Sequence, residues 1–383
     1  MIVNEIILSL SLFILFCFIF ILPGTHINTF ALFLSNIIKN NLVKSILLYL
    51  LALAMNLAEF LRVYLFKEVR PGYEFSLSFF KGEISNLEKL FKLSLYIYPL
   101  IVLMTPLFLF ILPVIEKFSY PYSYFLLTAI FFILFVKSIK RKEDLLIFLL
   151  SCFLGILIFR IKSLPDPFYP LLTGIYGIPS LLIANKESTK NRIHMSKKRE
   201  KLSWIDYIAL TLILIILAFI PAITPTIALM FLLLFIPYNL INKLFLLVAI
   251  NLGDVYISFI TRKLFNKARL GAFSYITNLN NNNFVITILI SMLIFPLLCI
   301  FYKEFVKCIR NYEYFINAKQ TRYFIFLLLF LICFYYDGLC GIIIMIASTI
   351  LGILCCELEV DIMYTIPSLI APTLFYFFSY YLL

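Results

Sequence analysis

The chain has 383 residues, of which 63% are hydrophobic and only 14% are charged, and its mean hydropathy is +1.04. A typical soluble domain is about 45–50% apolar and about 25% charged, so this composition excludes a soluble globular protein and indicates an all-α polytopic membrane protein. The formal net charge of +12 does not indicate a nucleic-acid partner. The basic residues gather in short loops near 137–142, 186–201 and 303–322, as they do on the cytoplasmic side of membrane proteins.

Long apolar runs follow one another along the whole chain. A membrane-spanning helix needs about 20 predominantly apolar residues, and such runs are predicted near 5–22, 42–66, 91–115, 121–137, 144–162, 204–220, 240–261, 284–302, 322–336, 340–355 and 362–382. Three shorter apolar segments, interrupted by Pro or Gly, are either further spans or re-entrant halves: 24–36, 168–184 and 221–238. The sequence therefore predicts about 11–14 membrane segments. The first run is interpreted as a retained span, because residues 1–4 hold no basic residue and no small-residue cleavage site follows.

Polar residues interrupt the apolar sequence directly after the first run. The stretch ILPGTHINTF at 21–30 combines a proline break with neutral hydrogen-bonding side chains. Helix N-termini beside such a break bind carboxylate or phosphate through exposed N–H groups. This predicts a substrate-binding segment at Pro23, Gly24, Thr25, His26, Asn28 and Thr29. For His26, a polar residue at the membrane interface is an equally good interpretation.

One hydrophilic segment near the middle, KESTKNRIHMSKKREKLS at 186–203, divides the chain into two parts of similar length. We interpret it as a basic cytoplasmic linker between an N-terminal transmembrane repeat (1–185) and a C-terminal transmembrane repeat (204–383). Placing the basic loops inside leaves Arg262, Lys263, Lys267 and Arg269 outside, against the positive-inside rule. The sequence leaves open whether the repeats are parallel or inverted.

The evidence for a repeat is a pair of related hexapeptides. Ala-Met-Asn-Leu-Ala-Glu at 54–59 matches Ala-Ile-Asn-Leu-Gly-Asp at 249–254, and each follows a proline-broken polar segment by about 30 residues. The second such segment is IPAITPT at 220–226, where the predicted substrate-binding residues are Pro221, Thr224 and Thr226. Secondary transporters are commonly built from repeats whose broken helices bind substrate near the membrane midplane. The pattern therefore favours a two-fold repeated, transporter-like helical bundle with broken or re-entrant helices.

Each hexapeptide ends in an acid inside an apolar span, and ionisable residues there are costly and usually functional. Asn56 lies three residues before Glu59, and Asn251 three before Asp254, on the same helical face. An Asn–carboxylate pair can coordinate a cation or accept a proton, which predicts coupling-ion residues Asn56, Glu59, Asn251 and Asp254. The alternative for Glu59 is a structural ion pair with Arg62.

No motif of enzyme chemistry is found. The sequence lacks a nucleophile elbow, a P-loop and a dinucleotide fingerprint, and its eight cysteines show no metal-ligand spacing. We therefore predict no catalytic residues, no metal site and no cofactor. Gly174, Gly177, Gly338 and Gly341 are predicted to allow close helix packing.

Several of these segments together resemble a known family. In chain order, ILPGTHINTFAL, PFYPLLTGIYGIPSLL, FIPAITPTIAL, NLGDVYISFITRKLFNKARLGAF, YYDGLCGIIIMIASTILGIL and IPSLIAPTLFYF are similar to the archaeal branch of the TctA family, the large membrane subunit of tripartite tricarboxylate transporters. The family's Pro-Gly-centred segment corresponds to residues 23–29, and its counterpart to 221–226. Its Lys-Ala-Arg-Ser-Gly-Ala stretch corresponds to 267–272, with Leu270 in place of Ser. Here Ala222 stands where the family's second Pro-Gly has Gly.

The resemblance implies uptake of a small organic anion such as a carboxylate across the cell membrane, driven by sodium ions or protons. It also implies a small membrane subunit or an extracytoplasmic binding protein as partner, besides the lipid bilayer. The alternative is a transport-inactive scaffold or assembly subunit, suggested by the lost glycines. A third possibility, an intramembrane enzyme, is disfavoured because no catalytic constellation is present.

Overall fold

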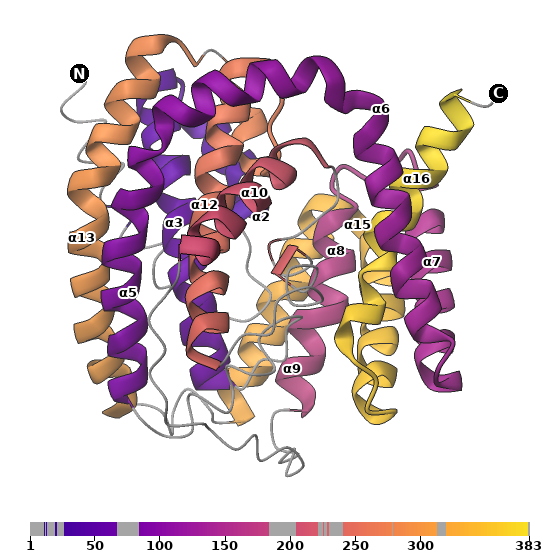
Figure 1. Cartoon of the computed structure of the whole chain (residues 1–383). Coiled ribbons are helices and arrows are strands. Elements are labelled where there is room, and N and C mark those ends of the chain that lie inside the picture. The colour runs from indigo at the N-terminus through magenta and orange to yellow at the C-terminus, as the bar shows by residue number, and fades with distance from the viewer. Residues whose placement is uncertain are drawn as a thin grey trace.

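The structure is a computed structural model of the chain. It describes residues 27–66, 84–183, 204–220, 240–277, 279–311 and 319–381, together with the single residues 11, 13, 20, 225, 228 and 229. Within this part of the chain every regular element is a helix (Figure 1). The elements are α2 (Ile27–Ile37), α3 (Asn41–Phe66), α5 (Ile84–Leu103), α6 (Thr105–Ser138), α7 (Lys142–Arg160), α8 (Phe168–Leu172), the π-helix η1 (Thr173–Gly177), α9 (Ile178–Ile183), α10 (Trp204–Phe219), α12 (Leu240–Phe265), the 3₁₀-helix η2 (Gly271–Tyr275), α13 (Asn281–Asn311), α15 (Lys319–Glu357), the 3₁₀-helix η3 (Ile362–Thr365) and α16 (Pro367–Tyr381).

Five of the described helices are long and apolar enough to cross a membrane: Asn41–Leu61, Phe245–Phe265, Asn281–Glu304, Gln320–Glu357 and Ile362–Ser379. Several carry large apolar side chains on their outer surface, for example Leu293 and Leu297 on α13 and Ile343 on α15. Apolar residues in such positions are satisfied by lipid rather than by water. The chain is therefore a multi-pass helical membrane protein, as its composition predicted.

The predicted span 91–115 is wrong in its boundaries. The helix breaks at Met104, where α5 and the beginning of α6 meet at an angle of 56°. It then continues without interruption through the predicted gap at 116–120 as far as Ser138. Pro106 accounts for the new start, because proline in the first helical turn lacks an N–H that would have no partner there.

The predicted spans 322–336 and 340–355 are two helical parts of α15, joined at Gly338. Gly338 has φ 62° and ψ −153°, outside the helical region. A Cβ on Gly341 would lie 3.1 Å from the Sγ of Cys333, whereas residues eight apart in a straight helix are separated by about 12 Å. The chain therefore folds back at Gly338. Each part, 319–337 and 339–357, is about 28 Å long, close to the thickness of a bilayer core.

Glycine packing is confirmed at some of the predicted positions and wrong at one. A Cβ on Gly174 would lie 2.4 Å from the Cβ of Ser348 and 2.6 Å from the carbonyl oxygen of Met345, so η1 packs closely on α15. A Cβ on Gly338 would instead meet nothing within 4 Å. Gly338 is required for its positive φ rather than for close approach.

The helices pack into two groups, connected by α6. The first bundle contains α2, α3, α5, α10, α12, η2 and α13, and the second contains α7, α8, η1, α9, α15, η3 and α16 (left and right halves of Figure 1). Helix α6 packs against α10 and α12 of the first bundle and against α7 and α16 of the second. Both bundles combine helices from before and after residues 186–203. The two predicted halves of the chain therefore interlock.

Candidate functional site

Most of the predicted substrate-binding residues lie outside the part of the chain that the structure describes. Pro23, Gly24, Thr25, His26, Pro221, Thr224 and Thr226 lie outside the described residues. Asn28 and Thr29 lie in the first turn of α2. That turn is anchored to the first hexapeptide, because the backbone N–H of Ile27 contacts the Sδ of Met55 at 3.4 Å. The meeting of segments 23–29 and 221–226 stays a prediction.

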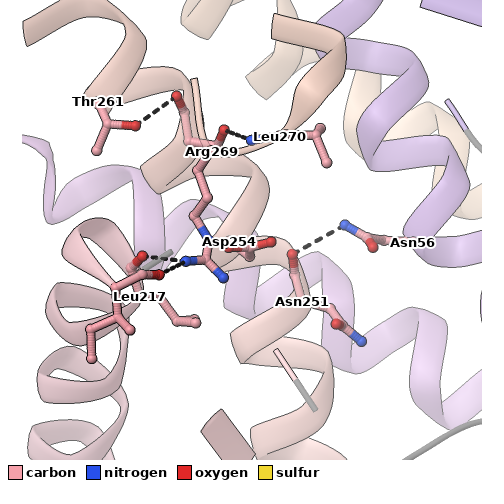
Figure 2. A network of polar contacts seen from close by, with 9 residues as sticks. Asn56, Leu217, Asn251, Asp254, Thr261, Arg269 and Leu270 are labelled. Atoms are coloured by element: carbon pink, nitrogen blue, oxygen red, sulfur yellow. Dashed lines mark hydrogen bonds and ion pairs between the residues drawn. The ribbon is translucent and has the colours of Figure 1, made fainter. Parts of the chain in front are cut away.

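The two related hexapeptides come together in the first bundle. The side-chain amide of Asn56 on α3 donates a hydrogen bond to the backbone carbonyl of Asn251 on α12 over 3.1 Å (Figure 2). Both asparagines are buried, and the contact joins residues 195 positions apart in the chain. A buried polar group needs such a partner, because in hydrocarbon an unsatisfied amide is costly.

The two acids of the hexapeptides lie in different surroundings. Asp254 forms an ion pair with Arg269, with 2.5 Å between its Oδ1 and the arginine Nε, and both side chains are largely buried (Figure 2). Glu59 is half-buried on α3, and the side chain of its predicted alternative partner, Arg62, lies outside the described side chains. The coupling-ion role of all four residues stays a prediction.

Arg269 also holds the end of α10. Its Nη1 donates to the backbone carbonyls of Leu217 at 2.5 Å and Ile220 at 2.9 Å (Figure 2 shows both bonds). The last carbonyls of a helix have no partner within the helix, and a cation there also interacts favourably with the helix dipole. Ile220 directly precedes Pro221, so Arg269 positions the point at which the second proline-broken segment begins.

The other basic residues of this loop are bound to the protein as well. Arg262 donates to the carbonyls of Ile276 and Asn266, and Lys263 to that of Leu279. Lys267 forms an exposed ion pair with Glu116 on α6 at 3.5 Å. The loop charges that conflicted with the positive-inside rule therefore have structural partners, which weakens them as a signal of orientation.

A layer of buried hydroxyl groups crosses the first bundle, and sequence reasoning missed it. Tyr98 on α5 contacts Ser291 on α13 at 2.5 Å and Tyr49 on α3 at 3.3 Å. Thr105 on α6 bonds to Tyr256 on α12. Tyrosine is abundant throughout the chain, so no local pattern distinguishes these residues. Networks of this kind rigidify a core when every member is satisfied.

The arginine beside Asp254 is already engaged within the protein, by one carboxylate and two backbone carbonyls. A guanidinium presents planar donors that match a carboxylate, and here it is held in a largely dry environment where ionic hydrogen bonds are strong. Sequence reasoning selected Asp254 and missed Arg269 as its partner, because fifteen residues and a turn separate them. The only signal for Arg269 was its place in the Lys-Ala-Arg stretch. Comparison of the chain with known protein families, curated proteins and solved structures finds no match.

Proposed function

We propose that this protein is a secondary transporter that carries a small organic anion such as a carboxylate across the cell membrane, driven by sodium ions or protons. The observation that carries the proposal is the position of the Asp254–Arg269 ion pair. Asp254 belongs to the second hexapeptide, whose Asn251 accepts the hydrogen bond from Asn56. Arg269 binds the end of α10, the helix that leads into segment 221–226. Polar groups from both halves of the chain thus converge within an apolar bundle.

An internal duplication would support the transporter class, and the reciprocal packing of the helices is in favour of one. Let α3 correspond to α12, α5 to α13, α7 to the second part of α15, and the segment α8–α9 to α16. Contacts then occur in reciprocal pairs: α3 packs on α13 as α12 packs on α5, and α7 packs on α16 as α15 packs on η1. Secondary transporters are commonly built from repeats of this kind.

Two further pairs of matching sequence motifs agree with this correspondence. Ser-x-x-Leu-Gly-Ile-Leu occurs at 151–157 and 348–354, and Tyr-x-Ile-Pro-Ser-Leu at 176–181 and 364–369. A Cβ on Gly155 would lie 2.1 Å from the carbonyl oxygen of Ser368, and a Cβ on Gly352 would lie 2.4 Å from that of Ile175. Each copy of the first motif therefore packs at the second motif of the opposite half.

The ion pair suggests how substrate and coupling ion are linked. When the carboxylate of a substrate binds Arg269, Asp254 loses its counter-charge. A buried carboxylate without a partner costs several kcal/mol, so a sodium ion or a proton must neutralise it, with Asn56, Glu59 and Asn251 as the nearest candidate ligands from the two hexapeptides. Anion and cation then bind together, which is the requirement for coupled transport. Thr25, His26, Asn28 and Thr29, with Pro23 and Gly24, and Pro221, Thr224 and Thr226 would complete the anion site.

The second candidate is a transport-inactive scaffold or assembly subunit. Ala222 in place of glycine, and an ion pair whose arginine already satisfies helix carbonyls, favour it. A small membrane subunit or an extracytoplasmic binding protein would be a partner in either case. Thermal denaturation in a panel of carboxylates separates the two functions, because a ligand that binds only the folded state must raise the Tm.

The direct test is uptake into proteoliposomes containing the purified full-length chain. A carboxylate should accumulate under a sodium or proton gradient, and Asp254→Asn should abolish the dependence on the gradient. Lys267→Gln is the matched control, because it removes an exposed ion pair of the same loop. Uptake that ignores the gradient, or no uptake of any carboxylate, contradicts the proposal.

A further inference from the structure

A second pair of carboxylates lies outside the site described above, where α15 folds back. The backbone N–H of Asp166, in the loop between α7 and α8, donates to Oδ1 of Asp337 at 3.1 Å. Asp337 is only 7% exposed, and its Oδ2 is buried without any hydrogen-bond partner. The residues are 171 positions apart, and Asp337 directly precedes the reversal at Gly338.

Among the described residues, no positive charge neutralises this pair. Within the described part of the chain, no Lys, Arg or His lies within 4.0 Å of either carboxylate, and Lys162 of the same loop is exposed. Arg160 at the end of α7 lies over the ring of Phe375 instead. The remaining titratable groups on the surrounding elements are neutral: Tyr169 on α8, Tyr176 in η1, Tyr275 in η2, and Cys333 and Tyr336 on α15.

An ionised carboxylate oxygen with no partner is costly to bury, and protonation removes that cost by neutralising the group. The neighbouring acid responds to the same environment. Burial raises the pKa of Asp166 above its usual value, although its carboxylate accepts backbone N–H groups of Phe168 and Tyr169, which act in the opposite direction. A second carboxylate nearby further disfavours the ionised form of a buried carboxyl group, and the backbone bond from Asp166 to Asp337 keeps the two acids close.

Two further acids, Asp144 on α7 and Asp361 at the start of η3, lie near each other elsewhere in the second bundle. Asp361 caps η3 by accepting the N–H of Met363 at 3.0 Å, as Asp166 accepts that of Phe168 at 3.1 Å. Asp144 is likewise 7% exposed, and its Oδ1 has no hydrogen-bond partner. The Nε of Arg141 lies 4.0 Å from this oxygen. A cation therefore lies beside Asp144, whereas none of the described residues places one within 4.0 Å of Asp337.

We propose that the Asp166–Asp337 pair is a proton-binding site, in which one proton is held on the Asp337 carboxyl and released to water as the pH rises. The site deepens the proposed transport function by supplying a carboxyl for a coupling proton. Proton binding itself is measured without substrate, so it stands or fails separately from transport.

The test is infrared difference spectroscopy of the full-length protein in lipid, recorded between acidic and alkaline pH. The wild type should show one carbonyl band of a protonated carboxylic acid that persists to a higher pH than the bands of the exposed carboxyl groups, and should lose it as the pH rises further. Asp337→Asn should remove that band, whereas Asp144→Asn should leave it unchanged. Absence of the band in the wild type, or its persistence in Asp337→Asn, would overturn the proposal.

A second variant keeps the test valid if Asp337→Asn does not fold. Asp337→Glu retains the carboxyl and should retain the band with a shifted midpoint, and an unchanged midpoint counts against the proposal. A persistent band together with absent carboxylate uptake refutes the transport function and leaves the proton site standing. Gradient-driven uptake by a protein that lacks the band would support the transport function and refute the proton site.

Discussion

The side-chain amide of Asn56 bonds to the backbone carbonyl of Asn251 at 3.1 Å, so the two related hexapeptides touch inside the first bundle. The residues occupy the same position in the two hexapeptides and lie on the two helices that carry the predicted coupling acids. Contact between equivalent residues is expected near the axis of a two-fold repeat. Glu59 on α3 and Asp254 on α12 therefore lie on helices that pack against each other.

Replacing Asn56 by Ala should lower stability, because the amide donor to Asn251 is lost inside the bundle. Hydrogen bonds between membrane helices contribute about 0.6 to 2 kcal/mol. The measurement is thermal or denaturant-induced unfolding of the purified chain. Thr211→Ala is the control, since that hydroxyl bonds only to Tyr207 on its own helix. Equal stability of the two variants would show that the contact between hexapeptides contributes nothing.

Removing one member of the Asp254–Arg269 pair should be far more damaging than removing both. Arg269→Gln leaves a largely buried carboxylate without its partner, which costs about 3–5 kcal/mol. Asp254→Asn combined with Arg269→Gln should recover a large part of that loss, and a double-mutant cycle gives the coupling energy. Additive effects of the two single changes would mean that the residues do not interact.

The reciprocal glycine contacts make a prediction about two symmetric substitutions. Gly155→Ala and Gly352→Ala each place a methyl group against backbone, and such overpacking costs about 1–3 kcal/mol. The two losses in unfolding free energy should be similar. Gly253→Ala should cost less, although its Cβ would lie 2.3 Å from Leu214, because there the obstacle is a side chain that can move. Very different losses at Gly155 and Gly352 would argue against equivalent packing.

The reversal in α15 depends on backbone conformation rather than on space. Gly338→Ala should destabilise the protein by about 1–3 kcal/mol, because the combination of φ 62° and ψ −153° is essentially restricted to glycine. Gly338→Asn should lose a similar amount, since asparagine tolerates the left-handed helical region but not this one. Circular dichroism during thermal unfolding measures both. An alanine variant as stable as the wild type would mean that the chain can reverse without positive φ.

Sequence periodicity and composition were sufficient for the class of protein and for most helices. Apolar runs long enough to cross a membrane can be recognised without knowing how the helices pack. The observed helices α3, α7, α10 and α12 therefore lie close to their predicted ranges. The boundary between 91–115 and 121–137 failed because helix continuity through Glu116 and Lys117 depends on what surrounds them. Lys267, from a distant loop, pairs with Glu116 there.

What the sequence by itself determined was the membrane class and the hexapeptides that carry Asn56, Glu59, Asn251 and Asp254, whereas the linker predicted at 186–203 lies outside the described residues. Only the tertiary structure decided that Arg269 neutralises Asp254, that Asp337 meets Asp166, and that the two halves interlock instead of standing side by side. The physical reason is that hydrophobic burial in lipid selects residues by type, which a sequence displays directly. Ion pairs and hydrogen bonds require particular atoms to meet across long loops, and their positions are known only once the helices are packed.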